Sequence, residues 1–167
     1  ELEAWTDLTR IVREKVKPYR DSLGANPNNT PLKRRWWAYQ AHRPELYAAL
    51  SRMTRTLACS QTSKFVTFAF LPTNIIFSQK LNVLLLDTWT AFSFLQSRVH
   101  EAWALFFGST LEDRPVYTPS DCFETFPFPN AWPDHPLAET AGKDYYEFRS
   151  ARMISSDEGL TDLYNRF

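Results

Sequence analysis

The sequence predicts an α+β fold in which helices flank a small mixed or antiparallel sheet between residues 54 and 118. Residues 54–60, 65–71 and 83–86 are short apolar stretches that contain β-branched and aromatic residues, as is typical of strands of one sheet. Apolar residues recur at helical spacing on either side of them. Hydrophobic residues make up 44% of the chain and aromatic residues 16%, which suffices for a packed core.

The first 53 residues predict a helical connector. Its first helix has apolar positions at Trp5, Leu8, Ile11, Val12 and Val16. Pro18 predicts the end of that helix, and residues 21–31 indicate a loop because they combine glycine, prolines and three asparagines. Pro44 occupies a position typical of the first turn of another helix, which continues to Leu50.

A long helix follows the predicted strands. Asp87 or Thr88 can cap it, and its apolar pattern runs over residues 89–107 and ends at Gly108. The predicted apolar stripe consists of Phe92, Leu95, Val99, Trp103 and Phe106, and Arg98, His100 and Glu101 lie off it.

The last third of the chain combines a proline-rich segment with further helices. Five prolines in residues 115–133 predict extended backbone without a long helix. Residues 137–153 indicate a helix, and 160–167 begin another element. We therefore divide the chain into a connector (1–53), a recognition core (54–129) and a helical tail (130–167). Because the chain begins within a predicted helix, we expect it to be a fragment of a longer protein with a truncated tail.

Charge is unevenly distributed, although the net charge is zero. Residues 8–64 hold 12 basic and 3 acidic side chains, a balance of +9, whereas residues 65–167 have a balance of −6. A phosphate backbone would attract the first segment. A solvated basic face balanced by an acidic half explains the same pattern, so charge alone leaves both interpretations open.

Several kinds of catalytic and cofactor chemistry lack their residues here. The four glycines are far apart in sequence, so no glycine-rich turn for a nucleotide cofactor is expected. Three histidines (His42, His100 and His135) and two cysteines show no paired ligand spacing, so we expect neither a metal site nor a catalytic residue. No apolar run approaches the roughly 20 residues that span a bilayer. The low cysteine content fits a reduced, cytoplasmic setting.

Taken in order, several segments resemble one family. They are Glu14-Lys15-Val16-Lys17-Pro18, Arg35-Trp36-Trp37, residues 43–49, Ser63-Lys64, residues 95–103, residues 117–129 ending in Phe126-Pro127-Phe128-Pro129, and Gly159-Leu160-Thr161 with Tyr164-Asn165. In that order they are similar to the C-terminal part of fused adenine-N6 DNA methyltransferases of type IIG and type IIL restriction–modification systems. These MmeI-like enzymes and related phage-defence methylases carry a target-recognition domain behind the catalytic domain.

The resemblance implies a DNA sequence-specificity domain that is not an enzyme by itself. Its partners would be double-stranded DNA and the methyltransferase domain of the same parent chain. That catalytic domain would bind S-adenosylmethionine and flip the target base out of the duplex, while this domain positions the DNA. The alternative is a scaffolding segment that docks the catalytic domain and contacts DNA little.

Ten residues are candidates for DNA contact: Lys33, Arg34, Arg35, Arg55, Gln61, Ser63, Lys64, Arg98, Arg114 and Tyr117. The first three, beside two tryptophans, are suited to phosphate binding, or else form a surface helix turn whose tryptophans anchor the core. Lys64, just before the predicted central strand at 65–71, is the strongest single candidate because it is basic and lies in a segment that resembles the family. An ordinary strand-end lysine is the alternative.

The other candidates have structural alternatives of their own. Arg55 would face the same surface as Lys64. Arg98 could instead pair with Glu101 or Glu124. Arg114 and Tyr117 lie in a predicted loop that could enter a groove of DNA, and a tyrosine at the rim of the core is the alternative.

Overall fold

The computed structural model describes residues 2–39 and 43–166, so His42, one of the histidines considered above, lies outside the described residues. The chain divides into two compact units, unit 1 (residues 1–46) and unit 2 (residues 47–167). The predicted boundaries of connector, core and tail stay a prediction. No helix among the described residues is long and apolar enough to cross a membrane.

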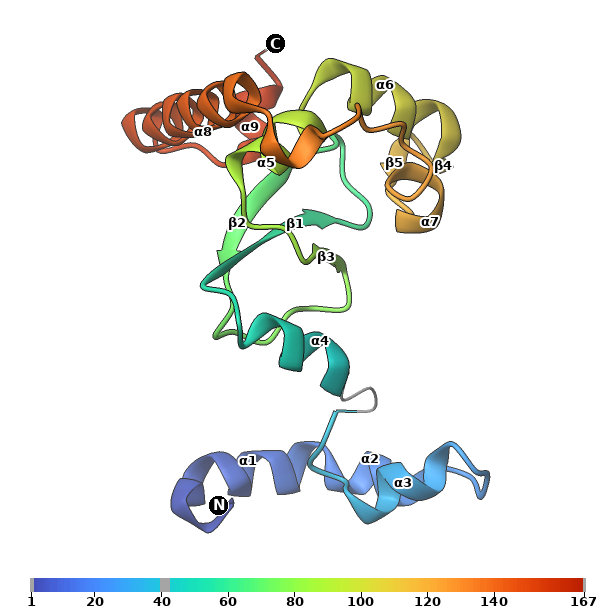
Figure 1. Ribbon diagram of the computed structural model, residues 1–167. Coiled ribbons are helices and arrows are strands. Elements are labelled where there is room, and N and C mark those ends of the chain that lie inside the picture. The colour runs from blue at the N-terminus through green and yellow to red at the C-terminus, as the bar shows by residue number, and fades with distance from the viewer. Residues whose placement is uncertain (1, 40–42, 167) are drawn as a thin grey trace. The chain divides into compact units, whose positions relative to one another are not determined.

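Unit 1 is helical (Figure 1). Its elements are η1 (Leu2–Trp5), α1 (Thr6–Lys15), α2 (Lys17–Ser22) and α3 (Asn29–Arg34). The first helix ends at Lys15, close to Pro18 as predicted. Pro18 itself lies in the first turn of α2, where its missing N–H costs no hydrogen bond. The predicted loop at 21–31 is shorter than expected because Asn26 accepts a hydrogen bond from the Asn29 backbone N–H (2.8 Å), and α3 begins there.

The helix α4 (Pro44–Leu50) begins at the predicted proline, and Leu50 is buried. The three predicted strands are present as β1 (Arg55–Ser60), β2 (Phe68–Pro72) and β3 (Leu81–Leu84). They form an antiparallel sheet in the order β2-β1-β3, which confirms the α+β class. The central strand is β1, so the strand predicted to be central at residues 65–71 is instead an edge strand.

The predicted helix at 89–107 is two helices, α5 (Trp89–Leu95) and α6 (Arg98–Phe107). Thr88 caps the first by accepting from Ala91 N–H (3.2 Å), and Ser97 caps the second by accepting from His100 N–H (3.1 Å). The helix restarts at Ser97, so a different face of α6 is turned toward the core, and the predicted apolar stripe was wrong at Val99 and Phe106. Val99 is 70% exposed and Phe106 80%, whereas His100 is buried.

The rest of unit 2 adds a hairpin that the sequence did not predict, followed by helices (Figure 1). Its elements are β4 (Ser109–Leu111), β5 (Arg114–Val116), α7 (Pro119–Cys122), η2 (Trp132–Asp134), α8 (Pro136–Ser156) and α9 (Leu160–Tyr164). The hairpin pairs Leu111 with Arg114 around a two-residue turn in which Glu112 has a φ of 58°.

The core of unit 2 lies between one face of the sheet and the helices that follow it. Phe68, Phe92 and Leu57 are fully buried within it. The helix α8 packs closely against α5 at Gly142, where a Cβ atom would lie 2.2 Å from the Trp89 carbonyl oxygen. The predicted tail is thus part of the same packed unit as the sheet.

Candidate nucleic-acid interface

The segment that leaves β1, residues 61–64, pairs with the β4–β5 hairpin. We call it the 61–64 loop. The Gln61 carbonyl accepts from Tyr117 N–H (2.8 Å), Thr62 forms a bridge with Val116, and Ser63 N–H donates to the Pro115 carbonyl (3.4 Å). These bonds attach the loop to the side of β5. The two backbone segments that carry the candidates Gln61, Ser63 and Arg114 therefore lie next to each other.

The same loop also borders the turn before β3. The Gln61 backbone N–H donates to the Lys80 carbonyl oxygen (2.8 Å). The side chains of Gln61, Lys64, Lys80 and Arg114 are exposed, and Ser63 is partly buried. We define these five residues as the loop–hairpin surface. Sequence reasoning missed Lys80 because only the antiparallel register of β1 and β3, Ser60 opposite Leu81, brings it beside Gln61.

Lys64 is exposed yet held by neighbouring groups. Its ammonium nitrogen donates to the Asn165 side-chain oxygen and lies 5.3 Å from the centre of the Phe65 ring. The Ser63 hydroxyl donates to the Phe65 carbonyl (2.5 Å), which orders the turn between them. These contacts connect the loop to neighbouring side chains while leaving the Lys64 side chain at the surface.

Arg55 and Arg98 have structural partners. The Arg55 guanidinium lies 3.9 Å from the centre of the Phe70 ring and 4.0 Å from that of Trp89, and its Nε donates to the Asp87 carbonyl (2.9 Å). The guanidinium thus lies against two perpendicular aromatic rings, which stabilises the packing of α5 on the sheet.

Arg98, which is 92% exposed, pairs with Glu101 at 2.6 Å, one of the two acidic partners considered above. Contact of Arg55 or Arg98 with DNA stays a prediction.

Tyr117 is buried, as in the structural alternative, and we leave it out of the interface. His100 Nδ1 lies 2.8 Å from the Leu95 carbonyl, which only accepts, so Nδ1 carries the proton. His100 Nε2 therefore accepts from the Tyr117 hydroxyl (3.2 Å). Burial lowers the pKa of His100 and raises that of Tyr117, so both side chains stay neutral.

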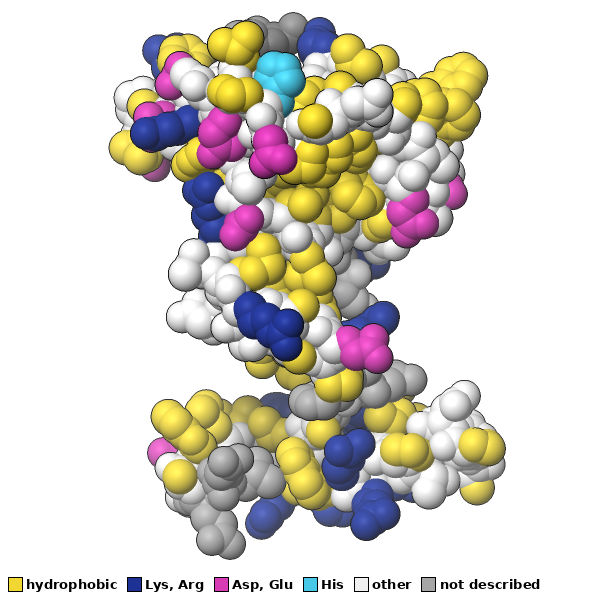
Figure 2. Space-filling view, viewed as in Figure 1, with side chains coloured by type: hydrophobic (Ala, Val, Ile, Leu, Met, Phe, Trp, Pro, Cys, Tyr) yellow, Lys and Arg dark blue, Asp and Glu magenta, His cyan; other side chains and the backbone are white. Residues whose placement is uncertain are grey.

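The three basic candidates for DNA contact in unit 1 lie at the end of α3. Lys33 and Arg34 belong to the helix and Arg35 follows it. Within the described part of the chain, none of the three forms an ion pair. Arg34 and Arg35 line an open hollow together with Thr30 and Pro31. On the face shown in Figure 2, Lys and Arg side chains are prominent over unit 1.

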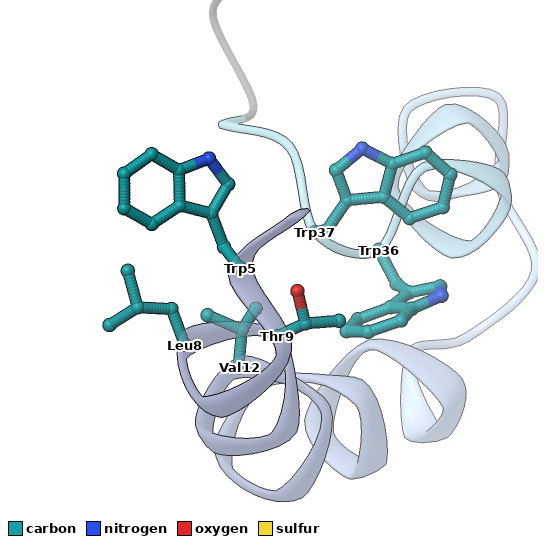
Figure 3. A pocket seen from close by; sticks show the side chains of 6 residues that line it. All are labelled: Trp5, Leu8, Thr9, Val12, Trp36 and Trp37. Carbon is teal, nitrogen blue, oxygen red and sulfur yellow. The ribbon is translucent and has the colours of Figure 1, made fainter. Parts of the chain in front are cut away.

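The tryptophans beside these cations contact α1. Trp36 and Trp37 meet edge to face, with ring centres 5.6 Å apart. With Trp5, Leu8, Thr9 and Val12 they line a pocket of about 120 Å³ (Figure 3). The tryptophans can therefore anchor this segment on the first helices while the neighbouring cations bind phosphate. The two interpretations are compatible because they concern different side chains.

The described residues contain no cluster of three histidine, cysteine or acidic side chains that could hold a metal ion. Cys59 and Cys122 are buried free thiols. Burial raises the pKa of the Cys59 thiol to about 12 and also raises that of Cys122, so neither favours the nucleophilic thiolate.

The family model described as "MmeI, target recognition domain" matches residues 2–130. The chain belongs to the MmeI target recognition domain family. Domains of this family have a DNA sequence-recognition role in restriction–modification enzymes and are non-catalytic by themselves. No curated protein and no solved structure matches the chain.

The match to the MmeI target recognition domain covers both candidate regions, the loop–hairpin surface and the cations that end α3. It does not cover α8 and α9, although both helices pack within unit 2. Asn165, which binds Lys64, lies in the unmatched part.

Proposed function

We propose that this target recognition domain recognises duplex DNA sequence through the loop–hairpin surface. The observation that carries the proposal is the pairing of the 61–64 loop with β5 and with Lys80, which gathers exposed long polar side chains at one place. We further propose that it serves an adenine-N6 methyltransferase whose separate catalytic domain binds S-adenosylmethionine and flips the target base. Such an enzyme would act in the cytoplasm, in defence against phage.

The chemistry of the loop–hairpin surface suits base recognition. A two-stranded ribbon fits the major groove, and hairpin β4–β5 with the attached loop has that form. Arg114 and Lys64 can donate to guanine, and the Gln61 amide can both donate to and accept from adenine. The backbone bonds of the loop fix these groups in advance, which reduces the entropy lost on binding.

Unit 1 would supply phosphate contacts. Lys33, Arg34 and Arg35 lack intramolecular ion partners among the described residues, so DNA phosphates would not have to displace carboxylates. Phosphate contacts fix register without carrying sequence information, and they make binding depend on salt.

A scaffolding role is the second candidate, and exposed apolar side chains favour it. Val99 and Phe106 on α6 are mostly exposed, as are Trp5 and Leu8 on the first helices of unit 1. Exposed apolar patches commonly mark protein contacts. This role would dock the catalytic domain and leave DNA contact to other parts of the parent enzyme.

The decisive experiment substitutes Lys64→Ala in the intact restriction–modification enzyme and measures DNA binding on several duplex sequences. We expect a loss of roughly 1–3 kcal/mol that depends on sequence if Lys64 contacts a base, and a uniform loss if it contacts a phosphate. Lys143→Ala on α8 is the matched control, since that lysine is exposed and pairs only weakly with Glu147 (3.9 Å). Unchanged affinity after Lys33, Arg34, Arg35 and Lys64 are all neutralised would favour scaffolding.

The purified 167-residue chain tests the assignment of catalysis to another domain. We expect it to bind duplex DNA weakly, because it supplies one side of a DNA clamp and hence fewer phosphate contacts. We also expect no transfer of methyl groups from S-adenosylmethionine to DNA. Methyl transfer by this chain alone would overturn the assignment.

A further inference from the structure

The outer edge of β2 is closed by side chains in place of a further strand. β2 is an edge strand, and Phe68 and Phe70 direct backbone polar groups away from β1. The Gln96 amide accepts from Phe68 N–H (2.9 Å) and donates to the Val66 carbonyl (3.3 Å), as a neighbouring strand would. The Tyr146 hydroxyl accepts from Phe70 N–H (3.2 Å).

Arg149 on α8 completes this arrangement. Its Nη2 donates to the Phe68 carbonyl (2.7 Å), and its Nη1 donates to the Gln96 side-chain oxygen (3.1 Å). The guanidinium is buried and pairs with no described carboxylate. It lies instead 5.0 Å from the ring centres of Phe92 and Tyr146. A buried cation held by carbonyl, amide and aromatic groups depends on precise geometry, because it has no counter-charge.

Residues in and just after the C-terminal helix α9 connect Arg149 to the 61–64 loop. The Tyr164 hydroxyl accepts from Arg149 Nη1 (3.4 Å), and its ring lies 5.8 Å from that of Phe65. The next residue, Asn165, accepts from Lys64. Contacts of Arg149, Gln96 and the α9 region therefore reach Lys64, Phe65, Val66 and Phe68, which lie in the segment that leads from the loop–hairpin surface into β2.

We infer that Arg149 is a positioning residue for sequence recognition, and that the recognition unit includes α8 and α9. The inference rests on the proposed function of the loop–hairpin surface. Arg149 would not contact DNA. By fixing Phe68 and Gln96 it holds the end of the 61–64 loop, so that Gln61, Ser63 and Lys64 meet DNA in one conformation.

The test compares Arg149→Met with wild type in the intact restriction–modification enzyme. Hydrogen exchange followed by mass spectrometry should show faster exchange in peptides covering 61–70, while central strand β1 stays protected. Affinity for the preferred duplex, selected from a pool with a randomised central segment, should fall about tenfold, as expected for losing one well-placed contact set. Affinity for the unselected pool should change little, so the specificity ratio falls.

Matched variants separate positioning from general stability. Arg152→Met, one helical turn later and exposed, should leave exchange and specificity unchanged. Arg149→Lys should restore part of the specificity, since a lysine can reach the Phe68 carbonyl but cannot bridge to Gln96 as a fork. If Arg149→Met fails to fold, Asn165→Ala tests the same set of contacts at an exposed position, because it removes the acceptor for Lys64. We expect its specificity ratio to fall by about two- to threefold.

Two results would overturn the inference. Wild-type specificity in Arg149→Met and Asn165→Ala, alongside a loss in Lys64→Ala, would refute positioning by α8 and α9 while leaving the proposed function intact. No loss in any of the three variants would overturn the proposed function, and the inference with it.

Discussion

Both units carry predicted DNA-binding cations, but they support them differently. In unit 2 the 61–64 loop is bonded to the β4–β5 hairpin, to Lys80 before β3 and to Asn165 after α9, beside a packed core. In unit 1, among the residues whose burial is described, Leu32 alone is buried. The difference suits different tasks, because base recognition needs positions fixed to a fraction of an ångström, whereas phosphate contacts tolerate looser geometry.

The largest expected effect comes from removing core volume in unit 2. Phe92→Ala should lower the free energy of unfolding by about 3–5 kcal/mol, because Phe92 is fully buried and contacts Phe70 and Tyr146. Leu32→Ala in unit 1 should cost about 2 kcal/mol, the lower end for a buried leucine, because no second residue of unit 1 whose burial is described is buried. Urea unfolding of the two variants measures both values, and equal costs would break the contrast between the units.

Neutralising the three cations at the end of α3 should change the salt dependence of DNA binding more than its sequence specificity. With Lys33, Arg34 and Arg35 all replaced by Gln in the intact enzyme, the slope of log affinity against log salt concentration should fall by up to about three units. The ratio of preferred to unselected duplex should be preserved. If the ratio of affinities for preferred and unselected duplex changed while the salt slope stayed constant, base recognition would belong to unit 1 instead.

Loss of a helix cap inside unit 2 should have an intermediate effect on stability. Ser97→Ala removes the acceptor for His100 N–H and should cost about 1 kcal/mol in thermal or urea unfolding. Ser155→Ala is a suitable control because that hydroxyl is exposed and bonds only within its own helix. Equal stability of Ser97→Ala and wild type would argue against a true break between α5 and α6.

The smallest expected effect is a pH dependence from His100. Burial lowers the pKa of His100 in the folded state below its ordinary value of 6.5, so the unfolded chain binds the proton more readily. This contribution to stability is complete above pH 6.5 and is lost as the pH falls through the folded-state pKa. Urea unfolding at a series of pH values should show a shallower acid dependence in His100→Gln than in wild type.

The sheet and most helices could be predicted because their signals are local. Runs of β-branched and aromatic residues marked all three strands, and Pro44 and Gly108 marked helix ends. The break at Ser97 was missed because the apolar pattern continues across it, although a serine at this position can cap a new helix. The misplacement of His100 followed from that error, since its burial depends on a bond to Tyr117 that local spacing does not show.

The candidate site was harder to predict because it depends on the β4–β5 hairpin. Its turn carries Glu112 and Asp113 instead of the glycine or asparagine that usually marks a two-residue hairpin turn. The sequence marks Gln61, Ser63 and Lys64 as a polar segment before a strand, and Arg114 as a separate loop residue. Their proximity, and the inclusion of Lys80, came from strand register and long-range backbone bonds.

The closed edge of β2 also bears on self-association. An unpaired strand edge is a template on which other chains add by backbone pairing and aggregate. Side chains already occupy the outward polar groups of Phe68 and the N–H of Phe70. Loss of Arg149 would leave the Phe68 carbonyl without this partner, so the same side chain that orders the loop also helps to close the edge of β2 against the addition of another strand.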